Sequence, residues 1–251
     1  MREPLLASIR AKKAALDALR PVSGDALRHL RKYHDIELTY TSNAIEGNTL
    51  THRETAELIE HGITVGGKTL KEHLEVVDHH DALSWMRGLA DRTVLVGESV
   101  VRELHRRIVA RAEPAIAGLY SPHRRRIAGS AAVFPNPLKI PDLMRAFGLW
   151  LEQEQPGPHT AFDAHFRLTA IHPFSDGNGR AARLLMNLLL LRAGYVPVAV
   201  RPADRKRYLD ALEQGSLTGD TSSFQTFLHE RLDETLDEYL GALRETLPEN
   251  P

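Results

Sequence analysis

The sequence has no cysteine and no excess of charge of either sign. The absence of cysteine from all 251 residues excludes disulfide bonds, zinc sites built from thiolates and cysteine nucleophiles. Lys and Arg together number 32, and Asp and Glu together number 33, which gives a formal net charge of −1. This balance argues against a protein whose main task is to coat nucleic acid or an anionic membrane, so neither is an expected partner.

Long apolar runs are also missing. The longest, residues 184–191, is interrupted by Asn187 and is far shorter than the roughly 20 residues that a membrane-spanning helix needs. The first residues are rich in Ala, Lys, Arg and Leu, and they lack the apolar stretch and cleavage site of a signal peptide. We therefore expect a cytoplasmic protein. We also expect Asn187, a polar residue among leucines, to have a buried hydrogen-bond partner.

Apolar residues recur with helical periodicity along most of the chain. Pro, Gly and Ser concentrate instead in residues 113–141, where short strands are predicted around 124–127 and 132–134, with a turn at Gly129-Ser130. The predicted fold is therefore all-α with one small β-hairpin. The predicted helices cover residues 4–20, 25–45, 51–60, 71–89, 98–110, 141–154, 160–171, 178–191, 202–214 and 221–245.

One segment combines a helix end, a glycine-rich turn and a helix start. Pro173 disfavours the helical conformation of the residue before it, so His172 is expected at the end of a helix. Gly177 and Gly179 flank Asn178, and they allow the backbone to adopt positive φ and approach a ligand closely. The helix that follows begins with unpaired amide groups and the positive end of its dipole. We expect this turn to bind an anion, for which phosphate is the usual occupant.

Charged and titratable side chains surround the expected anion site. Arg180 and Arg183 are three residues apart on the first helical turn and share a face. Two cations at a helix N-terminus are unfavourable unless an anion binds there. Asp176 offers a carboxylate oxygen to Mg²⁺, and His172 has an ordinary pKa near working pH, which suits a general base. These are the groups that transfer of a phosphorus group requires.

Each of these features is common in purely structural settings when it occurs alone. A histidine before proline often ends a helix, Gly-Asn-Gly often forms a turn, and an arginine pair often lies on a solvated face. Their occurrence in this order, directly before an apolar helix, favours a catalytic segment.

The segment resembles the signature of the Fic family, His-x-Phe-x-(Asp/Glu)-Gly-Asn-Gly-Arg-x-x-Arg, at every specified position from His172 to Arg183. Its Gly-Asn-Gly core differs from the variant in the Doc toxins, which are kinases that hold ATP the other way round. Similarity to the family extends from about Ser42 to Phe227, and Phe174 would face the core and fix the loop. The resemblance implies a Fic-type helical bundle and a protein adenylyltransferase, which moves AMP from ATP to a Tyr, Ser or Thr hydroxyl of a target protein.

The resemblance implies a role for each residue of the motif. His172 would deprotonate the target hydroxyl, and Asp176 would hold Mg²⁺. The backbone amides of residues 177–179 would cradle the α- and β-phosphates of ATP. Arg180 and Arg183 would clamp the outer phosphates, with Arg183 nearest the γ-phosphate.

The predicted hairpin resembles the flap of Fic proteins, which aligns an extended segment of the target by strand addition. Ile127, Ala128 and Gly129 would then lie closest to the nucleotide. Tyr208 resembles a tyrosine that packs beside adenine in relatives, several of which have an asparagine where this chain has Ser216.

A second motif precedes this core. Ser42 and Glu46 are four residues apart and share a helical face, and Gly47 suits a helix end, so the segment alone predicts only a helix terminus. It also resembles the inhibitory motif of the family, (Ser/Thr)-x-x-x-Glu-(Gly/Asn), and implies an inhibitory helix at about residues 35–47. Glu46 would pair with Arg183 and occupy the cation meant for the γ-phosphate. In some relatives the same glutamate positions water to remove AMP, so de-AMPylation is a second implied activity.

These observations divide the chain into three regions. Residues 1–95 would form an N-terminal helical region with the inhibitory helix, 96–200 the Fic core with the flap and the catalytic loop, and 201–251 the C-terminal helices that pack on the core. Fic proteins often pair, so we also expect a homodimer.

Two alternatives to adenylyl transfer from ATP stay open. One is a Fic-fold transferase with another nucleoside triphosphate as donor, and the other is a regulatory protein that binds nucleotide without turnover. The presence of both His172 and Asp176 argues against the second.

Two further charged clusters admit rival interpretations. Residues 78–81, Asp-His-His-Asp, would suit a metal-dependent phosphohydrolase of the HD type, but the further His and Asp of that class are not found at suitable spacing. We interpret this cluster as a solvated helix face. Residues 123–126, His-Arg-Arg-Arg, precede the predicted hairpin and are expected to meet an acidic target or the nucleotide rather than nucleic acid.

Overall fold

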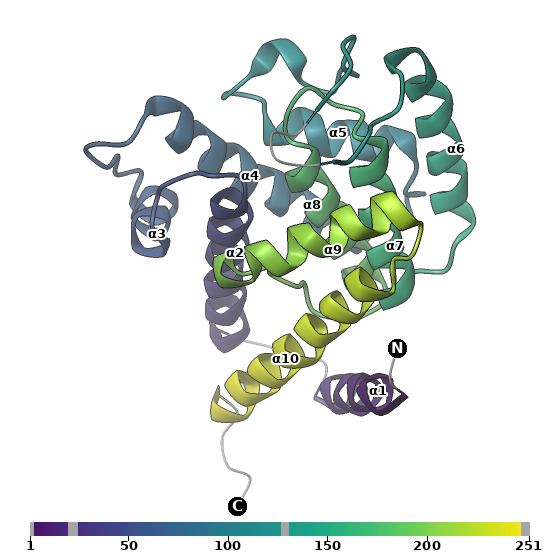
Figure 1. Cartoon of the computed structure of the whole chain (residues 1–251). Helices are drawn as coiled ribbons and strands as arrows, with labels where there is room; N and C mark the ends of the chain where they lie inside the picture. Colours follow the sequence, from purple (N-terminus) through teal and green to yellow (C-terminus); the bar gives the residue numbers. More distant parts are fainter. Residues whose placement is uncertain (1–2, 20–24, 127–130, 247–251) are drawn as a thin grey trace, which may run out of the picture.

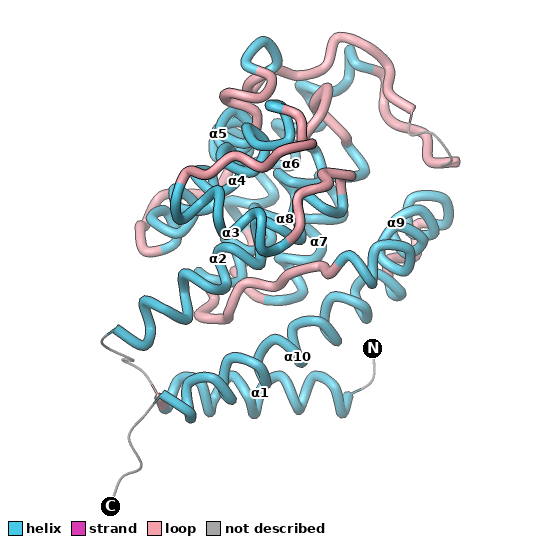
Figure 2. Tube along the Cα trace, turned by 90° about the vertical axis from the view of Figure 1, so that its left-hand side faces the viewer, coloured by secondary structure: helices cyan, strands magenta, loops and turns pink. Residues whose placement is uncertain are grey.

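The computed structural model describes residues 3–19, 25–126 and 131–246, and every predicted helix is present within them, with ends a few residues from the predicted ones (Figures 1 and 2). Short 3₁₀ turns lie at Pro114–Ile116, Pro137–Lys139 and Pro202–Asp204. The α-helices are α1 (Glu3–Ala18), α2 (Asp25–Ile45), α3 (His52–His61), α4 (Leu70–Ala90), α5 (Glu98–Ile108), α6 (Ile140–Gln153), α7 (Pro158–Ile171), α8 (Asn178–Arg192), α9 (Arg205–Thr218) and α10 (Ser222–Thr246).

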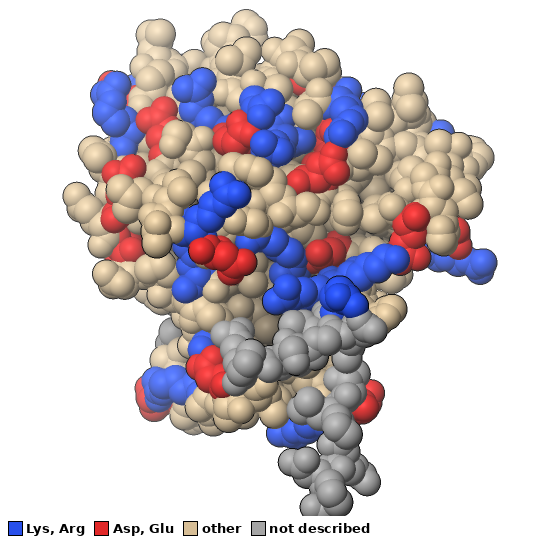
Figure 3. Space-filling model, turned by 180° about the vertical axis from the view of Figure 1, so that it is seen from behind, with Lys and Arg blue, Asp and Glu red and all other residues tan. Residues whose placement is uncertain are grey.

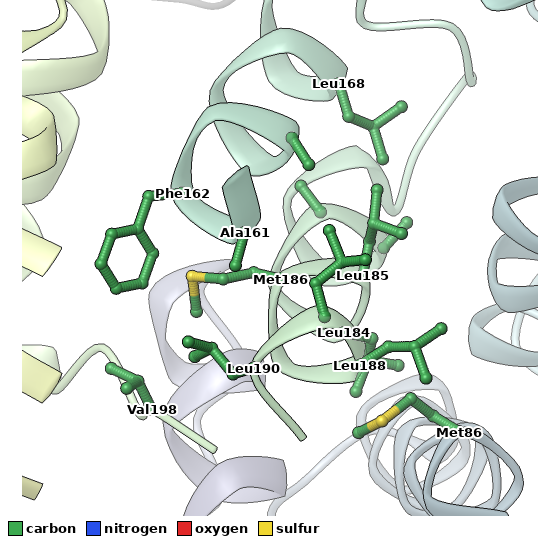
Figure 4. Packing of buried hydrophobic residues seen from close by; sticks show 14 of the residues in the cluster. Met86, Ala161, Phe162, Leu168, Leu184, Leu185, Met186, Leu188, Leu190 and Val198 are labelled. Carbon is green, nitrogen blue, oxygen red and sulfur yellow. The ribbon is translucent and has the colours of Figure 1, made fainter. Parts of the chain in front are cut away.

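Helix α8 is the centre of the apolar core. It packs against α7, α4 and α5, and nearly all of its side chains are buried. Figure 4 shows Leu184 and Leu188 of α8 beside Met86 of α4, and Met186 beside Ala161 of α7. Complete burial of a leucine or methionine stabilises a fold by about 1.5–3 kcal/mol, so this run fixes α8 firmly. The N-terminus of α8, where the anion site was predicted, is therefore held by the core.

Asn187 has the buried hydrogen-bond partner that was predicted for it. Its side-chain amide donates to the carbonyl oxygen of Val198 at 3.1 Å, and its carbonyl oxygen accepts the N–H of Val198 at 2.8 Å. The side chain therefore satisfies two backbone groups of the extended segment that follows α8, without leaving its own polar atoms unpaired.

The two ends of the described chain pack together. Helix α1 lies along α10 (Figures 1 and 2), with Ile9 and Leu16 buried between the helices. The hydroxyl of Ser8 donates to Asp233 at 2.7 Å, and Lys12 forms an ion pair with the same carboxylate at 2.8 Å. Among the described residues, one buried apolar cluster joins every α-helix except α3.

The predicted β-hairpin is not seen in the described residues on either side of its turn. Residues 124–126 and 131–134 contain no strand, and residues 127–130 lie outside the described part of the chain (Figure 2). The backbone N–H of Ala131 donates to Glu213 of α9 at 2.5 Å instead of to an opposite strand. The fold is therefore all-α as predicted, and only the hairpin is missing from what is shown.

The prediction of a solvated face at residues 78–81 was wrong for Asp78 and His79, whereas His80 is half-buried and Asp81 is exposed. Asp78 and His79 are fully buried. The Asp78 carboxylate accepts the backbone N–H groups of Arg111 and Ala112 at 2.7 and 2.9 Å, and it pairs with the Arg111 guanidinium at 2.9 Å. The prediction was wrong because α4 is covered by α2, α5 and α8, and because the turn after α5 supplies the donors that a buried carboxylate needs.

Surface charge agrees with the near-zero net charge of the sequence. On the face shown in Figure 3, basic and acidic side chains are interspersed rather than separated by sign. None of the helices in the described ranges has the length and apolar character that a membrane crossing requires.

Candidate active site

The loop between α7 and α8 has a strained backbone at its first residue. His172 ends α7 with φ 50° and ψ 55°, and it is the one non-glycine residue with positive φ in the described part of the chain. Its N–H still donates to Leu168 at 3.0 Å, and Pro173 then turns the chain away from the helix. A left-handed conformation at a non-glycine residue costs about 1–3 kcal/mol and is concentrated at functional sites. His172 lies among the residues that line a cavity described below.

Asn178 closes the same loop from the other side. Its side chain donates to the carbonyl oxygen of Phe174 and accepts the Phe174 N–H, both at 2.9 Å. Gly177 begins α8 with φ 73°, and a Cβ there would lie 3.3 Å from Val109 and 3.4 Å from His105. The glycine is thus required both by backbone conformation and by space. The first amide groups of α8 follow this loop directly, and the binding of an anion there stays a prediction.

His105 of α5 supports this loop, and the sequence interpretation missed it. Its ring stacks on that of Phe174, which is fully buried as predicted, with ring centres 3.7 Å apart. The Gly118 N–H donates to Nδ1 at 3.0 Å, so Nε2 carries the proton and donates to the carbonyl oxygen of Asp176 at 2.9 Å. Burial lowers the pKa of His105 to about 4, which keeps the ring neutral at neutral pH. His105 therefore positions the backbone of the residue expected to bind metal.

We expect the substitution His105→Phe to destabilise the protein by about 1–3 kcal/mol for each of the two backbone groups that it leaves without a partner. The ring stack on Phe174 would remain, so the loss would come from the hydrogen bonds to Gly118 and Asp176. The free energy of unfolding in urea measures the effect, with His123→Phe on the exposed surface as the matched control. Equal stability of His105→Phe and the wild type would show that these bonds do not hold the loop.

Arg183 of α8 is buried and bound to the end of α2. Its Nε donates to the Ser42 hydroxyl at 3.0 Å, and its Nη2 donates to the Ser42 carbonyl oxygen at 2.9 Å and to Glu46 at 2.7 Å. The Arg183 side chain is 5 % exposed, whereas that of Glu46 is 39 % exposed. A Cβ on Gly179 would lie 2.3 Å from the Glu46 carboxylate, so the glycine makes room for this ion pair. The residues predicted as an inhibitory pair are therefore in direct contact.

Arg180 is also buried, but its hydrogen-bonding capacity is only partly used. Its Nη2 forms an ion pair with Asp176 at 3.0 Å, and its Nη1 lies 3.8 Å from Glu75 of α4. Within the described residues, Nε and Nη1 of Arg180 have no hydrogen-bond partner. Buried donors of this kind are uncommon in folded proteins and are consistent with a site that binds an anion.

Glu46, His172, Gly179 and Arg183 border a cavity of about 430 Å³, which is within the range of small-molecule sites, whereas Asp176 and Arg180 are not among its lining residues. Helices α7, α8 and α9, the residue after α2 and the segment before α6 all contribute to its lining. The lining residues are Glu46, Ala132, Phe134, Thr169, His172, Gly179, Arg183, Arg205, Lys206, Tyr208, Leu209, Asp210, Leu212, Glu213 and Ser216. The cavity thus brings together a histidine, a helix N-terminus and a buried arginine.

His172 is poised as a neutral base beside this cavity. Its ring packs against that of Phe134 in a tilted arrangement, with ring centres 4.2 Å apart. Burial lowers the pKa of His172, while a hydrogen bond that the ring donates to the backbone of Thr169 and the charges of Glu46 and Asp176 act in the opposite direction. The imidazole is therefore unprotonated at neutral pH, as a general base must be.

Tyr208 lines the cavity but is largely a core residue. Its side chain is 1 % exposed, and its hydroxyl lies 2.9 Å from His165 Nε2 and 3.4 Å from Arg183. Burial raises the pKa of Tyr208, so the hydroxyl stays protonated. Ser216 lines the same cavity. The predicted contact of Tyr208 with adenine remains a proposal, as do the positions of Ile127, Ala128 and Gly129, which lie outside the described residues.

The donor chemistry of the site fits Mg²⁺ bound mainly by a nucleotide. Asp176 is 45 % exposed at the start of α8, where its carboxylate can reach a ligand. Mg²⁺ is commonly held by one or two carboxylates together with substrate phosphates and water. No group of three or more His, Asp or Glu residues suited to a metal occurs among the described residues.

The fold and this site define a helical protein with a nucleotide-sized cavity at the N-terminus of a buried helix. Residues 95–190 match the family model described as Fic/DOC family. The solved structure of Fic-1 from C. elegans is 30 % identical and has a TM-score of 0.83, over 95 % of this chain and 71 % of that chain. A Fic domain containing signaling protein from Bacteroides thetaiotaomicron is 29 % identical and has a TM-score of 0.87, over 97 % of this chain and 99 % of that chain. The chain belongs to the Fic/DOC family.

Sequence relatives carry a functional name. The protein adenylyltransferase Fic of Drosophila willistoni is 36 % identical over 245 residues, which are 96 % of this chain and 48 % of that protein. The protein of the same name in Drosophila melanogaster is 35 % identical over 96 % of this chain and 49 % of its own length. The chain therefore spans about half the length of the curated relatives that it matches.

Proposed function

We propose that this protein is an adenylyltransferase that moves AMP from ATP to a Tyr, Ser or Thr hydroxyl of a target protein. The observation that carries the proposal is the arrangement around one cavity of a neutral histidine, the N-terminus of α8 and the buried Arg183. The names of the Drosophila relatives support the same activity.

His172 supplies the base for this reaction. It accepts the proton of the target hydroxyl, whose oxygen then bonds to the α-phosphorus of ATP. The bond between the α-phosphorus and the bridging oxygen to the β-phosphate breaks, and pyrophosphate leaves. The first amide groups of α8 stabilise the negative charge on the phosphate oxygens, because they have no partner within the helix.

We assign Mg²⁺ to Asp176 together with the phosphates of ATP. When bound, the metal neutralises part of the phosphate charge. The buried Arg180 is available to the phosphates as well, because its Nε and Nη1 have no hydrogen-bond partner among the described residues.

Inhibition by Glu46 is part of the proposal. Its carboxylate occupies Arg183, the cation that the γ-phosphate would use, at 2.7 Å. ATP that binds while this ion pair persists would have its phosphates displaced from the arrangement needed for in-line attack. Because Glu46 borders the same cavity as His172, the same carboxylate also suits the activation of water for removal of AMP.

The target is proposed to align along residues 124–134, which include Ile127, Ala128 and Gly129, with its acceptor hydroxyl at His172. A homodimer and a cytoplasmic location complete the proposal.

Position-specific labelling of the donor tests the reaction type. The variant Glu46→Gly would be incubated with Mg²⁺ and ATP labelled either at the α- or at the γ-phosphate, and label in protein would be measured, self-modification included. Label from the α-position alone is expected. Label from the γ-position would instead indicate a kinase, and competition by unlabelled GTP, CTP or UTP stronger than by ATP would identify another donor.

A further inference from the structure

Glu75 of α4 lies between the end of α2 and the arginine pair of α8. One of its carboxylate oxygens accepts a hydrogen bond from the side-chain amide of Asn48 at 3.0 Å. The other lies 3.8 Å from Nη1 of Arg180. The side chain is 15 % exposed, so both interactions are largely shielded from water. Glu75 therefore contacts the segment that carries Glu46 and the residues expected to bind phosphate.

Asn48 follows Glu46 by two residues and ties this segment to α4. Its amide nitrogen donates to Glu75 and also to the carbonyl oxygen of Glu72, both at 3.0 Å. Its amide oxygen accepts the N–H of Leu50 at 3.1 Å. The side chain thus uses both ends of its amide, and it attaches the turn after α2 to the helix beneath it.

This attachment is one of the contacts that hold the end of α2, where Arg205 of α9 also donates to the carbonyl oxygen of Ile45 at 2.9 Å. Glu46 comes directly after the last residue of α2, and its own N–H bonds only within the helix end, to Asn43 at 3.0 Å. The backbone N–H of Asn48 also returns to Asn43, at 3.1 Å. The chain after α2 is therefore a compact turn, and Glu72 and Glu75 of α4 form hydrogen bonds with it through Asn48 and Thr49.

We propose that Glu75 is a positioning residue that keeps Glu46 on Arg183 by holding Asn48, and that it links this restraint to the phosphate side through Arg180. The inference rests on the proposed inhibition by Glu46. Phosphate oxygens that reach Arg180 bring negative charge close to the Glu75 carboxylate, and like charges repel. Nucleotide binding therefore weakens the hold of Glu75 on Asn48, in addition to competing with Glu46 for Arg183.

The test compares transfer of α-labelled AMP in two backgrounds. Asn48→Ala and Glu75→Ala are expected to raise the rate about 2- to 10-fold in the wild-type background, the range that loss of one net hydrogen bond gives. In the Glu46→Gly background Asn48→Ala should leave the rate unchanged, because the restraint that it loosens has no carboxylate left to position. Glu75→Gln retains an acceptor for Asn48, so its rate should stay closer to that of the wild type than the rate of Glu75→Ala does. Glu60→Ala on α3 is the matched control for loss of a carboxylate, because Glu60 forms its ion pairs with Lys32 and His61.

The outcomes separate this inference from the proposed inhibition. Equal fold-changes in both backgrounds would overturn it, because a general structural effect does not depend on Glu46. A strong response to Glu46→Gly with none to Asn48→Ala or Glu75→Ala would overturn the role of Glu75 alone. No response to Glu46→Gly would overturn the inhibition itself and the role of Glu75 with it. If an alanine variant fails to fold, Asn48→Asp retains the shape, removes the donor and is expected to raise the rate further.

Discussion

Glu46→Gly is expected to raise the rate of AMP transfer into protein by about one to two orders of magnitude. The reason is the charge-assisted hydrogen bond of 2.7 Å between Glu46 and the buried Arg183. Bonds to charged groups contribute about 1.5–3 kcal/mol, and each 1.4 kcal/mol corresponds to a factor of ten. Removal of the carboxylate leaves Arg183 with Ser42 and Tyr208 as partners and free to bind a phosphate.

Initial rates over a range of ATP concentrations measure this effect. The gain should appear mainly in kcat if ATP binds the inhibited protein with misaligned phosphates, and in KM as well if the carboxylate excludes the γ-phosphate. Glu37→Gly removes a carboxylate from α2, the helix that Glu46 follows, and is the control for loss of a carboxylate and for the greater backbone freedom of glycine, since Glu37 does not contact Arg183. Equal rates for Glu46→Gly and Glu37→Gly would contradict inhibition by Glu46.

His172→Ala in the Glu46→Gly background is expected to lower the transfer rate by about 10²- to 10⁴-fold, the usual contribution of a general base. ATP binding should change little, because the cradle at the start of α8 and the two arginines are intact in this variant. Loss of ATP binding in parallel with the loss of activity would show that His172 holds the nucleotide instead of taking the proton.

The pH profile of the Glu46→Gly variant is a second test of His172 as the base. The unprotonated imidazole is the active form, so the rate should rise with pH and then reach a plateau. Burial lowers the pKa of His172, so the midpoint of this rise should lie below the ordinary histidine value of about 6.5. Glu46 raises this pKa in the wild type, so its removal should move the midpoint lower still. A midpoint above 6.5 would indicate that another group supplies the base.

The helices and the catalytic loop could be predicted because their information is local. The end of α7 and the start of α8 depend on Pro173 and Gly177, which are near neighbours in sequence and act through their own backbone conformation. The contact of Glu46 with Arg183 joins residues 137 positions apart. Spacing alone could not predict it, and only the resemblance to an inhibitory motif indicated it.

The residues that were missed lie in ordinary helical patterns. His105 and Glu75 occupy amphipathic stretches, where a polar residue usually predicts a solvated face. A segment distant in sequence supplies the hydrogen-bond partners of each. The partners are Gly118 and Asp176 for His105, and Asn48 for Glu75. The error at Asp78 and His79 has the same origin, since a helix covered on several sides buries polar residues that its own sequence does not mark as buried.

The most direct test of the account compares three proteins given ATP labelled at the α-phosphate, with Mg²⁺ and with total protein analysed for label. The proteins are the wild type, Glu46→Gly, and Glu46→Gly combined with His172→Ala. Strong label in Glu46→Gly, with little in the other two, is the predicted result, since it requires adenylyl transfer, a base at His172 and inhibition by Glu46 together. Label of equal strength in Glu46→Gly and in the double variant would contradict the mechanism.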